Sequence, residues 1–380
     1  MKQIVFLAAL LLQQAATYAQ TQDVRVLEYR PAPGQFINTL PAIDAGMTEA
    51  ERLRACEEQL QDGLPVCLGG FGGYITLALG EPIENKRGSD LRILGNAFYA
   101  QNDPMYGAAT IGGSVEPGIV YAGVGESPAT AVWYELAGSE YYTTERHGYT
   151  ITYHRPTAET GEHKEPYMTY DQYIRWTASW TDSDGARQTE EGYMPKNAFR
   201  TQTYWPVWET VDELTLSGGR LPDNAVNYGG DGSDAANPQN WITYRYADDS
   251  YGYADAAPNT DDIYTTFDLD WAVDADGNHV SLDHADFIRV QTAVRQQCGW
   301  TGETSTEVTG LVNLHLLPGY DDNPIVINTR PTGVNGDVAD VKAPRETSRF
   351  TVDGRRLAHP ERGINIVRYS DGTVRKVVVK

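Results

Sequence analysis

The stretch FDLDWAVDADGNHVSL, residues 267–282, is rich in aspartate. A helical calcium-binding loop takes oxygen ligands from its first, third and fifth positions and has glycine at the sixth, where the backbone bends sharply. No register of this stretch meets these conditions; a loop starting at Asp274 places His279 at the sixth position. Asp276-Gly277 is instead a strong signal for a two-residue hairpin turn, because both central residues of a type I′ turn have positive φ. The stretch is therefore predicted to be a β-hairpin.

The hairpin is predicted to have one apolar and one acidic face, since successive side chains of a strand point to opposite sides. Val273 is expected to face Val280 across the ribbon. The apolar face then consists of Phe267, Leu269, Trp271, Val273, Val280 and Leu282. The acidic face consists of Asp268, Asp270 and Asp274.

The acidic face is a candidate calcium site. Residues i and i+2 of a strand lie about 7 Å apart, so Asp268 and Asp270 could share one ion. Carboxylates this close are separated by water, paired with arginine or bridged by a cation. Calcium binds about six to eight oxygens in flexible geometry, which suits a strand combined with a loop. The calcium hypothesis names Asp255, Asp261, Asp262, Asp268 and Asp270, and the alternative is a hydrated acidic surface.

Aromatic residues are numerous, with eight tryptophans and 24 tyrosines, and several occur in loop-like stretches. The clearest are TYWPVWET (203–210), DDSYGYADAAPN (248–259) and CGWTGET (298–304). Flat rings on loops suit sugar faces and planar ligands, because they supply contact area with little loss of entropy. The alternative is burial in a β-core. The predicted ligand-binding residues are Trp205, Trp208, Tyr251, Tyr253 and Trp300.

Motifs of catalysis are scarce. The sequence has no GxSxG nucleophile elbow, no HExxH zinc motif and no CxxC pair. Glu303 and Glu307 in GWTGETSTEV are a candidate pair of glycosidase carboxylates. In a chain with 52 acidic residues such pairs arise by coincidence, so the sequence favours binding over catalysis. A glycoside hydrolase that uses this pair is the alternative.

The N-terminus has the pattern of an export signal. Lys2 precedes an apolar run, residues 4–12, that is too short to span a bilayer, and Thr17-Tyr18-Ala19 fits a cleavage site. No other segment approaches transmembrane length, so we predict an exported protein without a transmembrane segment. Export permits a disulfide between Cys56 and Cys67; other pairings with Cys298, or three buried thiols, stay open.

The net charge of −22 is unevenly distributed. Residues 342–380 hold ten Lys or Arg against four Asp or Glu, whereas the rest of the chain is strongly acidic. An acidic body repels the phosphates of nucleic acids, which argues against that class of partner. The charge favours divalent cations, neutral ligands or basic partners.

Short apolar or alternating runs, separated by Gly, Pro, Asn and Asp, dominate the chain; examples are YITLAL (74–79), LRIL (91–94), GIVYAGV (118–124) and DFIRVQTAV (286–294). One helix is predicted over 47–60, where Thr48 and Glu51 can form a capping box. Many short strands and one helix predict an all-β antiparallel sandwich or barrel. We expect a signal peptide (1–19), a binding domain (20–316), a Pro- and Gly-containing linker (317–345) and a small β module (346–380).

From Leu27 to His315 the chain resembles a family of Bacteroidota cell-surface proteins. The resemblance rests on motifs that include VLEYRPAPGQFINTLP (26–41), LGGFGGYITLAL (68–79), WYELAGSEY (133–141), RLPDNAV (220–226) and GETSTEVTGLVNLHL (302–316). It implies a discoidin-like, galactose-binding-type jelly-roll β-sandwich. It also implies extracellular binding more than catalysis, and such proteins can accompany outer-membrane uptake systems, including those for corrinoids.

The C-terminal residues resemble a type IX secretion sorting domain, through DGRRL (353–357), GINIVRYSDG (363–372) and KVVVK (376–380). This resemblance implies the secretion machinery as a partner, and the surface or exterior of a Gram-negative cell as the location. The alternative is a solubilising basic β-tail. Together these expectations describe a non-catalytic binding protein for a glycan or another small ligand. An accessory protein that captures a ligand for an outer-membrane transporter is a further alternative.

Overall fold

The computed structural model describes residues 22–99, 112–157, 170–182, 184–197, 202–227, 241–247, 249–299 and 302–327, and then 346–351, 356–357, 359–360, 362–369 and 374–379. The chain divides into two compact units, 1–333 and 334–380, with the boundary inside the predicted linker. The predicted signal peptide (1–19) and Trp300 lie outside the described residues. Among the described helices, none has the length and hydropathy needed to cross a membrane.

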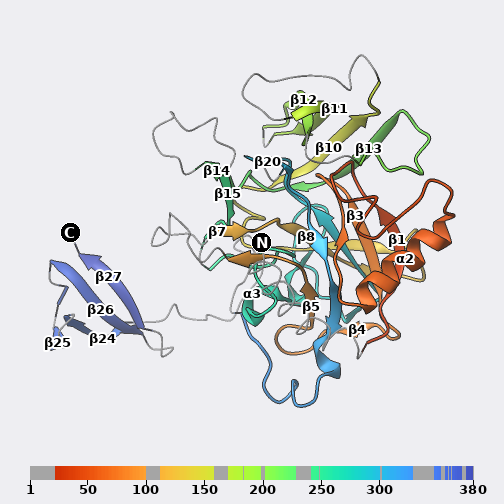
Figure 1. Ribbon diagram of the computed structural model, residues 1–380. Coiled ribbons are helices and arrows are strands. Elements are labelled where there is room, and N and C mark those ends of the chain that lie inside the picture. Colours follow the sequence, from red (N-terminus) through yellow and green to blue (C-terminus); the bar gives the residue numbers. More distant parts are fainter. Residues whose placement is uncertain are drawn as a thin grey trace, which may run out of the picture. The chain divides into compact units, whose positions relative to one another are not determined.

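The larger unit is built from antiparallel sheets (Figure 1), which confirms the predicted all-β class. Its largest sheet has the order β1-β3-β19-β8-β9-β17. These strands are β1 (Arg25–Arg30), β3 (Tyr74–Ala78), β19 (Phe287–Thr292), β8 (Gly118–Val124), β9 (Val132–Leu136) and β17 (Ala272–Val273). A three-stranded sheet, β16-β5-β23, consists of β16 (Thr266–Phe267), β5 (Leu91–Leu94) and β23 (Gly310–Asn313).

These two sheets contribute to one hydrophobic core. Ile75 on β3 opposes Val290 on β19, which opposes Val120 on β8, so the three side chains form a row on one face of the six-stranded sheet. The same buried cluster receives Leu91, Phe267 and Leu311 from the three-stranded sheet. Burying a side chain of this size contributes roughly 1.5–3 kcal/mol, so this shared core is the main source of stability in the unit.

Helix α2 (Glu49–Gln61) forms where the sequence predicts it. The Thr48 hydroxyl accepts a hydrogen bond from the Glu51 amide at 3.3 Å, and the Thr48 amide donates to the Glu51 carboxylate at 2.8 Å. This capping box provides acceptors for two backbone amides at the start of the helix, those of Thr48 and Glu51. Cys56 and Leu60 are buried in the core, and the Glu57 carboxylate accepts from the Val26 amide of β1 at 2.9 Å.

The larger unit also contains two four-stranded sheets. The first, β12-β11-β10-β13, has the long strands β12 (Arg187–Asn197), β11 (Tyr170–Thr181), β10 (Arg146–His154) and β13 (Glu213–Arg220). The second, β14-β15-β7-β6, has β14 (Ala225–Asn227), β15 (Trp241–Tyr244), β7 (Gly112–Ser114) and β6 (Phe98–Tyr99).

The remaining pairs are two-stranded: β18 (His284–Ala285) with β4 (Ile83–Glu84), β2 (Val66–Cys67) with β22 (Glu307–Val308), and β20 (Gln297–Cys298) with β21 (Gly302–Glu303). Three single-turn helices occur, α3 (Asp262–Thr265), η2 (Leu269–Trp271) and η4 (Leu314–Leu316), within the described ranges.

The aspartate-rich stretch 267–282 departs from the predicted strand alternation. The 3₁₀ turn η2 interrupts the strand, and Asp268 caps it by accepting a hydrogen bond from the Asp270 amide at 2.9 Å. The predicted placement of Asp268 on a solvent face is therefore wrong, because the carboxylate is buried beside its apolar neighbours. The predicted apolar residues Phe267, Leu269, Trp271, Val273 and Leu282 are buried as expected.

The tip of this stretch is a wider turn than the predicted type I′ hairpin. Gly277 has positive φ (79°), whereas Asp276 does not. Asp274 Oδ1 accepts hydrogen bonds from the amides of Asp276 and Asn278, at 2.9 and 2.8 Å. This side-chain cap adds a residue to the loop, so Val273 opposes His279 and not Val280.

The three cysteines are buried and none forms a disulfide, so the Cys56–Cys67 disulfide is wrong and the alternative of buried thiols is correct. Burial raises the pKa of the Cys67 thiol, and the carboxylates of Glu307 and Glu303 raise it further. Cys67 is therefore an uncharged, small core residue.

The smaller unit is a four-stranded antiparallel sheet in the order β25-β24-β26-β27. Its strands are β24 (Glu346–Thr351), β25 (Arg356–Leu357), β26 (Gly363–Tyr369) and β27 (Val374–Val379). Arg349 is buried and donates to the Asn365 side chain at 3.0 Å.

Candidate binding pocket

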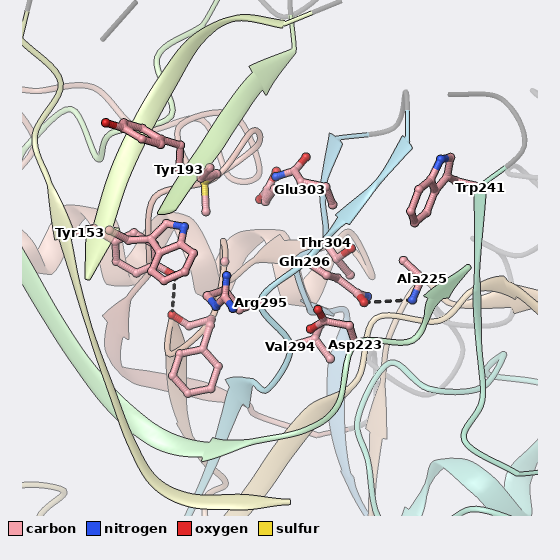
Figure 2. A pocket seen from close by; sticks show the side chains of 15 residues that line it. Tyr153, Tyr193, Asp223, Ala225, Trp241, Val294, Arg295, Gln296, Glu303 and Thr304 are labelled. Carbon is pink, nitrogen blue, oxygen red and sulfur yellow. Dashed lines mark hydrogen bonds between the residues drawn. The ribbon is translucent and has the colours of Figure 1, made fainter. Parts of the chain in front are cut away.

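A pocket of about 370 Å³ opens between β10–β12 of one four-stranded sheet and β14–β15 of the other (Figure 2). Tyr153 and Tyr193 lie on one side and Trp241 on the other, with Arg295 and Gln296 between them. This volume is in the range of pockets that enclose a small molecule, and the mixture of aromatic and polar side chains is typical of such sites.

The aromatic wall follows from strand register. Tyr153 on β10 is the direct neighbour of Trp176 on β11, and Trp176 is paired with Gly192 on β12. A Cβ atom at Gly192 would lie 2.5 Å from the Trp176 ring, so glycine is needed for the indole to lie across the strand. The Tyr153 hydroxyl donates to the Phe71 carbonyl at 2.9 Å, which fixes the phenol ring. The wall is therefore rigid, whereas Tyr193 is 43% exposed at the rim.

Arg295 places a positive charge in the floor. Its guanidinium lies 3.8 Å from the centroid of the Trp176 ring and 3.1 Å from the Glu190 carboxylate. Its Nε donates to the Tyr149 hydroxyl at 3.2 Å, and that hydroxyl in turn donates to Glu190. Burial raises the pKa of Tyr149 to about 12, against the opposing effect of Arg295. The phenol stays protonated, and the network holds the guanidinium in place.

Two polar atoms in the pocket have unused hydrogen-bonding capacity. Thr304 is 1% exposed, and its Oγ1 makes no hydrogen bond to any described residue; the same holds for Gln297 Oε1. Buried polar atoms without a partner are rare in native proteins and cost about 1–3 kcal/mol each. By contrast, Gln296 Oε1 accepts from the amides of Asn224 and Ala225 at 2.7 and 3.0 Å. Thr304 and Gln297 therefore hold unsatisfied oxygens just beneath the surface of the pocket.

The predicted aromatic residues do not gather in this pocket. Trp205 is buried in the cluster that contains Phe71, Tyr153 and Trp176, behind the pocket wall. Trp208 packs at 6.1 Å from the Tyr29 ring, under Arg52.

Tyr251 packs edge-on against Trp271 at 5.0 Å, and Tyr253 is buried with its hydroxyl accepting from the Glu140 amide at 2.8 Å. Trp300 lies outside the described residues. The sequence analysis missed Trp176, Tyr193, Trp241 and Arg295, and strand alternation around Trp176 was the signal that could have pointed to one of them.

The predicted carboxylate pair is divided between two places. Glu303 lines the pocket, and its Oε2 accepts from the Gln35 amide at 3.0 Å. Glu307 instead belongs to a group with Glu116 and Asp255, whose carboxylate oxygens lie within 4.8 Å of one another.

Burial raises the pKa of all three carboxyls in this group. Asp255 is nevertheless well supplied with donors: its Oδ1 accepts from the amides of Asn96 and Ala97 at 2.8 Å, and its Oδ2 from the Glu307 amide at 2.9 Å. Asp255 also has a positive φ of 54°. These bonds explain the group as a structural junction between the Asp255 loop, the chain at Asn96 and Ala97, and strand β22.

The other residues of the calcium hypothesis have separate partners. Asp262 pairs with Arg92 at 2.9 Å, and Asp261 accepts from the Tyr99 hydroxyl at 3.4 Å. Asp270 accepts from the Asn85 side chain at 2.9 Å, and Asp268 caps η2. Among the described residues, Asp255 alone of the five predicted ligands belongs to a group of three or more donors close enough to share a metal.

Comparison with known proteins identifies no family for this chain. No protein-family model matches the chain, and a search of curated proteins found no match. The geometry of the pocket is therefore the basis for a functional assignment.

Proposed function

We propose that this protein binds a carbohydrate in the pocket lined by Trp176, Tyr193, Trp241 and Arg295, and that it does so without catalysis. The observation that carries the proposal is the combination of aromatic faces with buried, unpartnered polar atoms in one pocket of about 370 Å³. A sugar ring has an apolar face that packs on an indole or phenol ring, and hydroxyls around its edge that bond polar side chains.

The polar groups match the hydroxyls of a sugar. The Thr304 hydroxyl can donate or accept, Gln297 Oε1 accepts, and the Arg295 guanidinium donates. A ligand that bonds Thr304 and Gln297 gains free energy that a purely apolar ligand does not gain, because both oxygens lack partners in the unliganded protein. Because Arg295 is already paired with Glu190, a neutral ligand fits better than a strong anion.

Binding is favoured over hydrolysis because the expected catalytic pair does not share the pocket. A glycosidase needs two carboxyl groups on either side of one bond, roughly 5–10 Å apart in the substrate site. Glu303 lines the pocket, whereas Glu307 lies in the buried group with Glu116 and Asp255.

The proposal includes the finer features implied by the resemblances: a discoidin-like jelly roll, membership of the Bacteroidota surface family, export, and a sorting role for residues 346–380. The antiparallel sheets of the larger unit support the all-β class to which a jelly roll belongs. The separate four-stranded unit supports the last, because a removable export address should fold apart from the binding domain.

A glycan array followed by calorimetry with the best glycan tests the function. Tyr193→Ala and Trp241→Ala should each weaken binding about tenfold or more, because rings of this kind dominate ligand contact. Thr304→Val removes the unpartnered hydroxyl without changing side-chain volume, so it should lower affinity while leaving the protein at least as stable. Phe98→Ala, an aromatic that is 50% exposed away from the pocket, is the matched control.

Two outcomes would overturn the proposal. If the pocket variants bind the glycan as the unchanged protein does, the ligand binds elsewhere. If sugar is released and Glu303→Gln abolishes the release, the protein is a hydrolase. A corrinoid assayed in parallel separates carbohydrate binding from the uptake alternative.

A further inference from the structure

We propose that Glu135, Glu145 and His147 form a binding site for a divalent transition metal ion, with Zn²⁺ as the best match. This site is separate from the carbohydrate pocket and does not depend on it. Glu135 lies on β9, His147 lies on β10, and Glu145 immediately precedes β10. One donor atom from each of the three side chains lies within 4.8 Å of the others.

Glu145 is the first indication of a missing partner. Its side chain is 0% exposed, yet apart from the His147 imidazole, 3.3 Å from Oε1, no described residue offers a donor to either carboxylate oxygen. Glu135 Oε1 is likewise buried without a hydrogen bond from any described residue. Two neighbouring carboxylates that have so few donors are costly to bury unless a proton or a cation lies between them.

The backbone leaves room for Glu145. A Cβ atom at Gly219 would lie 1.9 Å from Glu145 Oε1, so the strand β13 can approach the carboxylate only with glycine at this position. The carboxylate lies against Gly219 and close to His147, whose Nδ1 lies 3.3 Å from Oε1. This contact fixes Glu145 in the group.

His147 has the orientation of a metal ligand. Its Nε2 lies 3.0 Å from the Tyr141 carbonyl oxygen. A carbonyl can only accept, so Nε2 carries a proton, and Nδ1 faces the Glu145 carboxylate, where a metal ion would replace a proton on this nitrogen. Ligating histidines usually have this kind of backbone bond on the other nitrogen.

A β-bulge directs the His147 ring. The pairing of β10 with β13 shifts between Arg146 and Tyr149, and Gly148 has a φ of 64°. Bulges of this kind redirect side chains and are common beside functional sites. The Tyr141 ring then packs against the imidazole, with centroids 4.3 Å apart.

The donor set selects the class of metal. Two carboxylates and one imidazole suit Zn²⁺ or a related ion, whereas Ca²⁺ prefers oxygen ligands alone. Tetrahedral Zn²⁺ with bonds of about 2.0–2.1 Å separates its ligand atoms by roughly 3.4 Å, close to the spacing of Nδ1 and Oε1. His147 is 49% exposed, which leaves a side for solvent as the fourth ligand.

The state that competes with the metal is a shared proton. Burial and the neighbouring Glu145 carboxylate raise the pKa of Glu135, and a hydrogen bond to Glu145 raises the pKa of His147. A proton between the carboxylates and an imidazolium would balance part of the charge.

The test uses chelator-treated full-length protein at pH 7.5. Calorimetry with ZnCl₂ should show one ion per chain, and Co²⁺ should give the visible absorption of a four- or five-coordinate ion. His147→Ala should weaken Zn²⁺ binding at least tenfold, and Gly219→Ala should weaken it by displacing Glu145. His154→Ala is the matched control. His154 lies on β10 like His147 and also pairs with a glutamate, Glu213 at 3.2 Å. Among the described residues, however, it belongs to no group of three possible metal ligands.

The His147 ring is half-exposed, so its loss should leave the fold intact, and circular dichroism checks this. The proposal is wrong if the unchanged protein binds no Zn²⁺ in the micromolar range, or if His147→Ala binds it as tightly as His154→Ala does. Loss of binding in His147→Ala alone supports the site, whatever the glycan assays show.

Discussion

The buried carboxyl of Asp268 should make the protein less stable as the pH rises. Asp268 is 8% exposed, and burial raises its pKa from the ordinary 3.8 to about 7, with a smaller contribution from the nearby Asp90 carboxylate. The hydrogen bond from the Asp270 amide opposes this shift without cancelling it. The folded protein therefore holds a proton on Asp268 that the unfolded chain releases near pH 4.

The sign and size follow from proton linkage. A raised pKa contributes stability that is fully present below the unfolded value and is lost as the pH rises through the folded value. The rise in the pKa of Asp268 corresponds to roughly 4 kcal/mol of folding stability at low pH. About 3 kcal/mol of this stability is lost between pH 5 and pH 8.

The perturbation is Asp268→Asn. Asparagine carries no charge at any pH and keeps an oxygen that can accept from the Asp270 amide, so the cap on η2 is preserved. We expect the variant to be more stable than the unchanged protein by roughly 1.5 kcal/mol at pH 5 and by roughly 4 kcal/mol at pH 8, so the difference grows by about 2–3 kcal/mol over this range.

Urea unfolding followed by tryptophan fluorescence at pH 5, 6.5 and 8 gives the comparison. Asp283→Asn, at an exposed position nearby in the chain, is the control and should show no such trend. A stability difference that is constant from pH 5 to pH 8, or that reverses in sign, would refute the account of Asp268.

Two further predictions concern calcium and the C-terminal unit. Because the five predicted calcium ligands do not form one group, thermal midpoints in millimolar calcium and in chelator should be equal after the Zn²⁺ site has been emptied; a rise in calcium that Asp270→Asn removes would restore the calcium hypothesis. Deletion of residues 346–380 should leave the melting of the larger unit unchanged, since each unit is compact by itself, and should trap the protein in the periplasm; unchanged surface display of the truncated protein would contradict the sorting role.

Local signals in the sequence were enough to predict individual elements. The capping box of Thr48 and Glu51 starts α2 because both bonds lie within one turn of chain. Alternating runs such as residues 118–124 formed strands, and the glycines of LGGFGGY allow close backbone contact, as where a Cβ at Gly73 would lie 1.8 Å from the Leu68 carbonyl oxygen. The all-β class followed from the sum of these short-range preferences.

The local sequence pattern could not predict which side chains are buried. Trp205 and Tyr253 were expected on a binding surface but are buried, because long-range packing decides which of many aromatics stay accessible. Asp268 was assigned to solvent by strict alternation, and a single 3₁₀ turn reversed that assignment.

The pocket exists only through contacts distant in sequence, whereas the proposed metal site uses residues between 135 and 147 and one distant glycine, Gly219. The pocket joins Tyr153 and Trp176 to Trp241 and Arg295, which three different parts of the chain supply. The metal group needs Glu135 beside His147, a spacing that matches no linear motif, and a glycine from β13 to admit the carboxylate. Sequence determined the strands and the helix because hydrogen bonding and side-chain periodicity act over a few residues. Tertiary structure decided the sites because sheet register and bulges set which side chains meet.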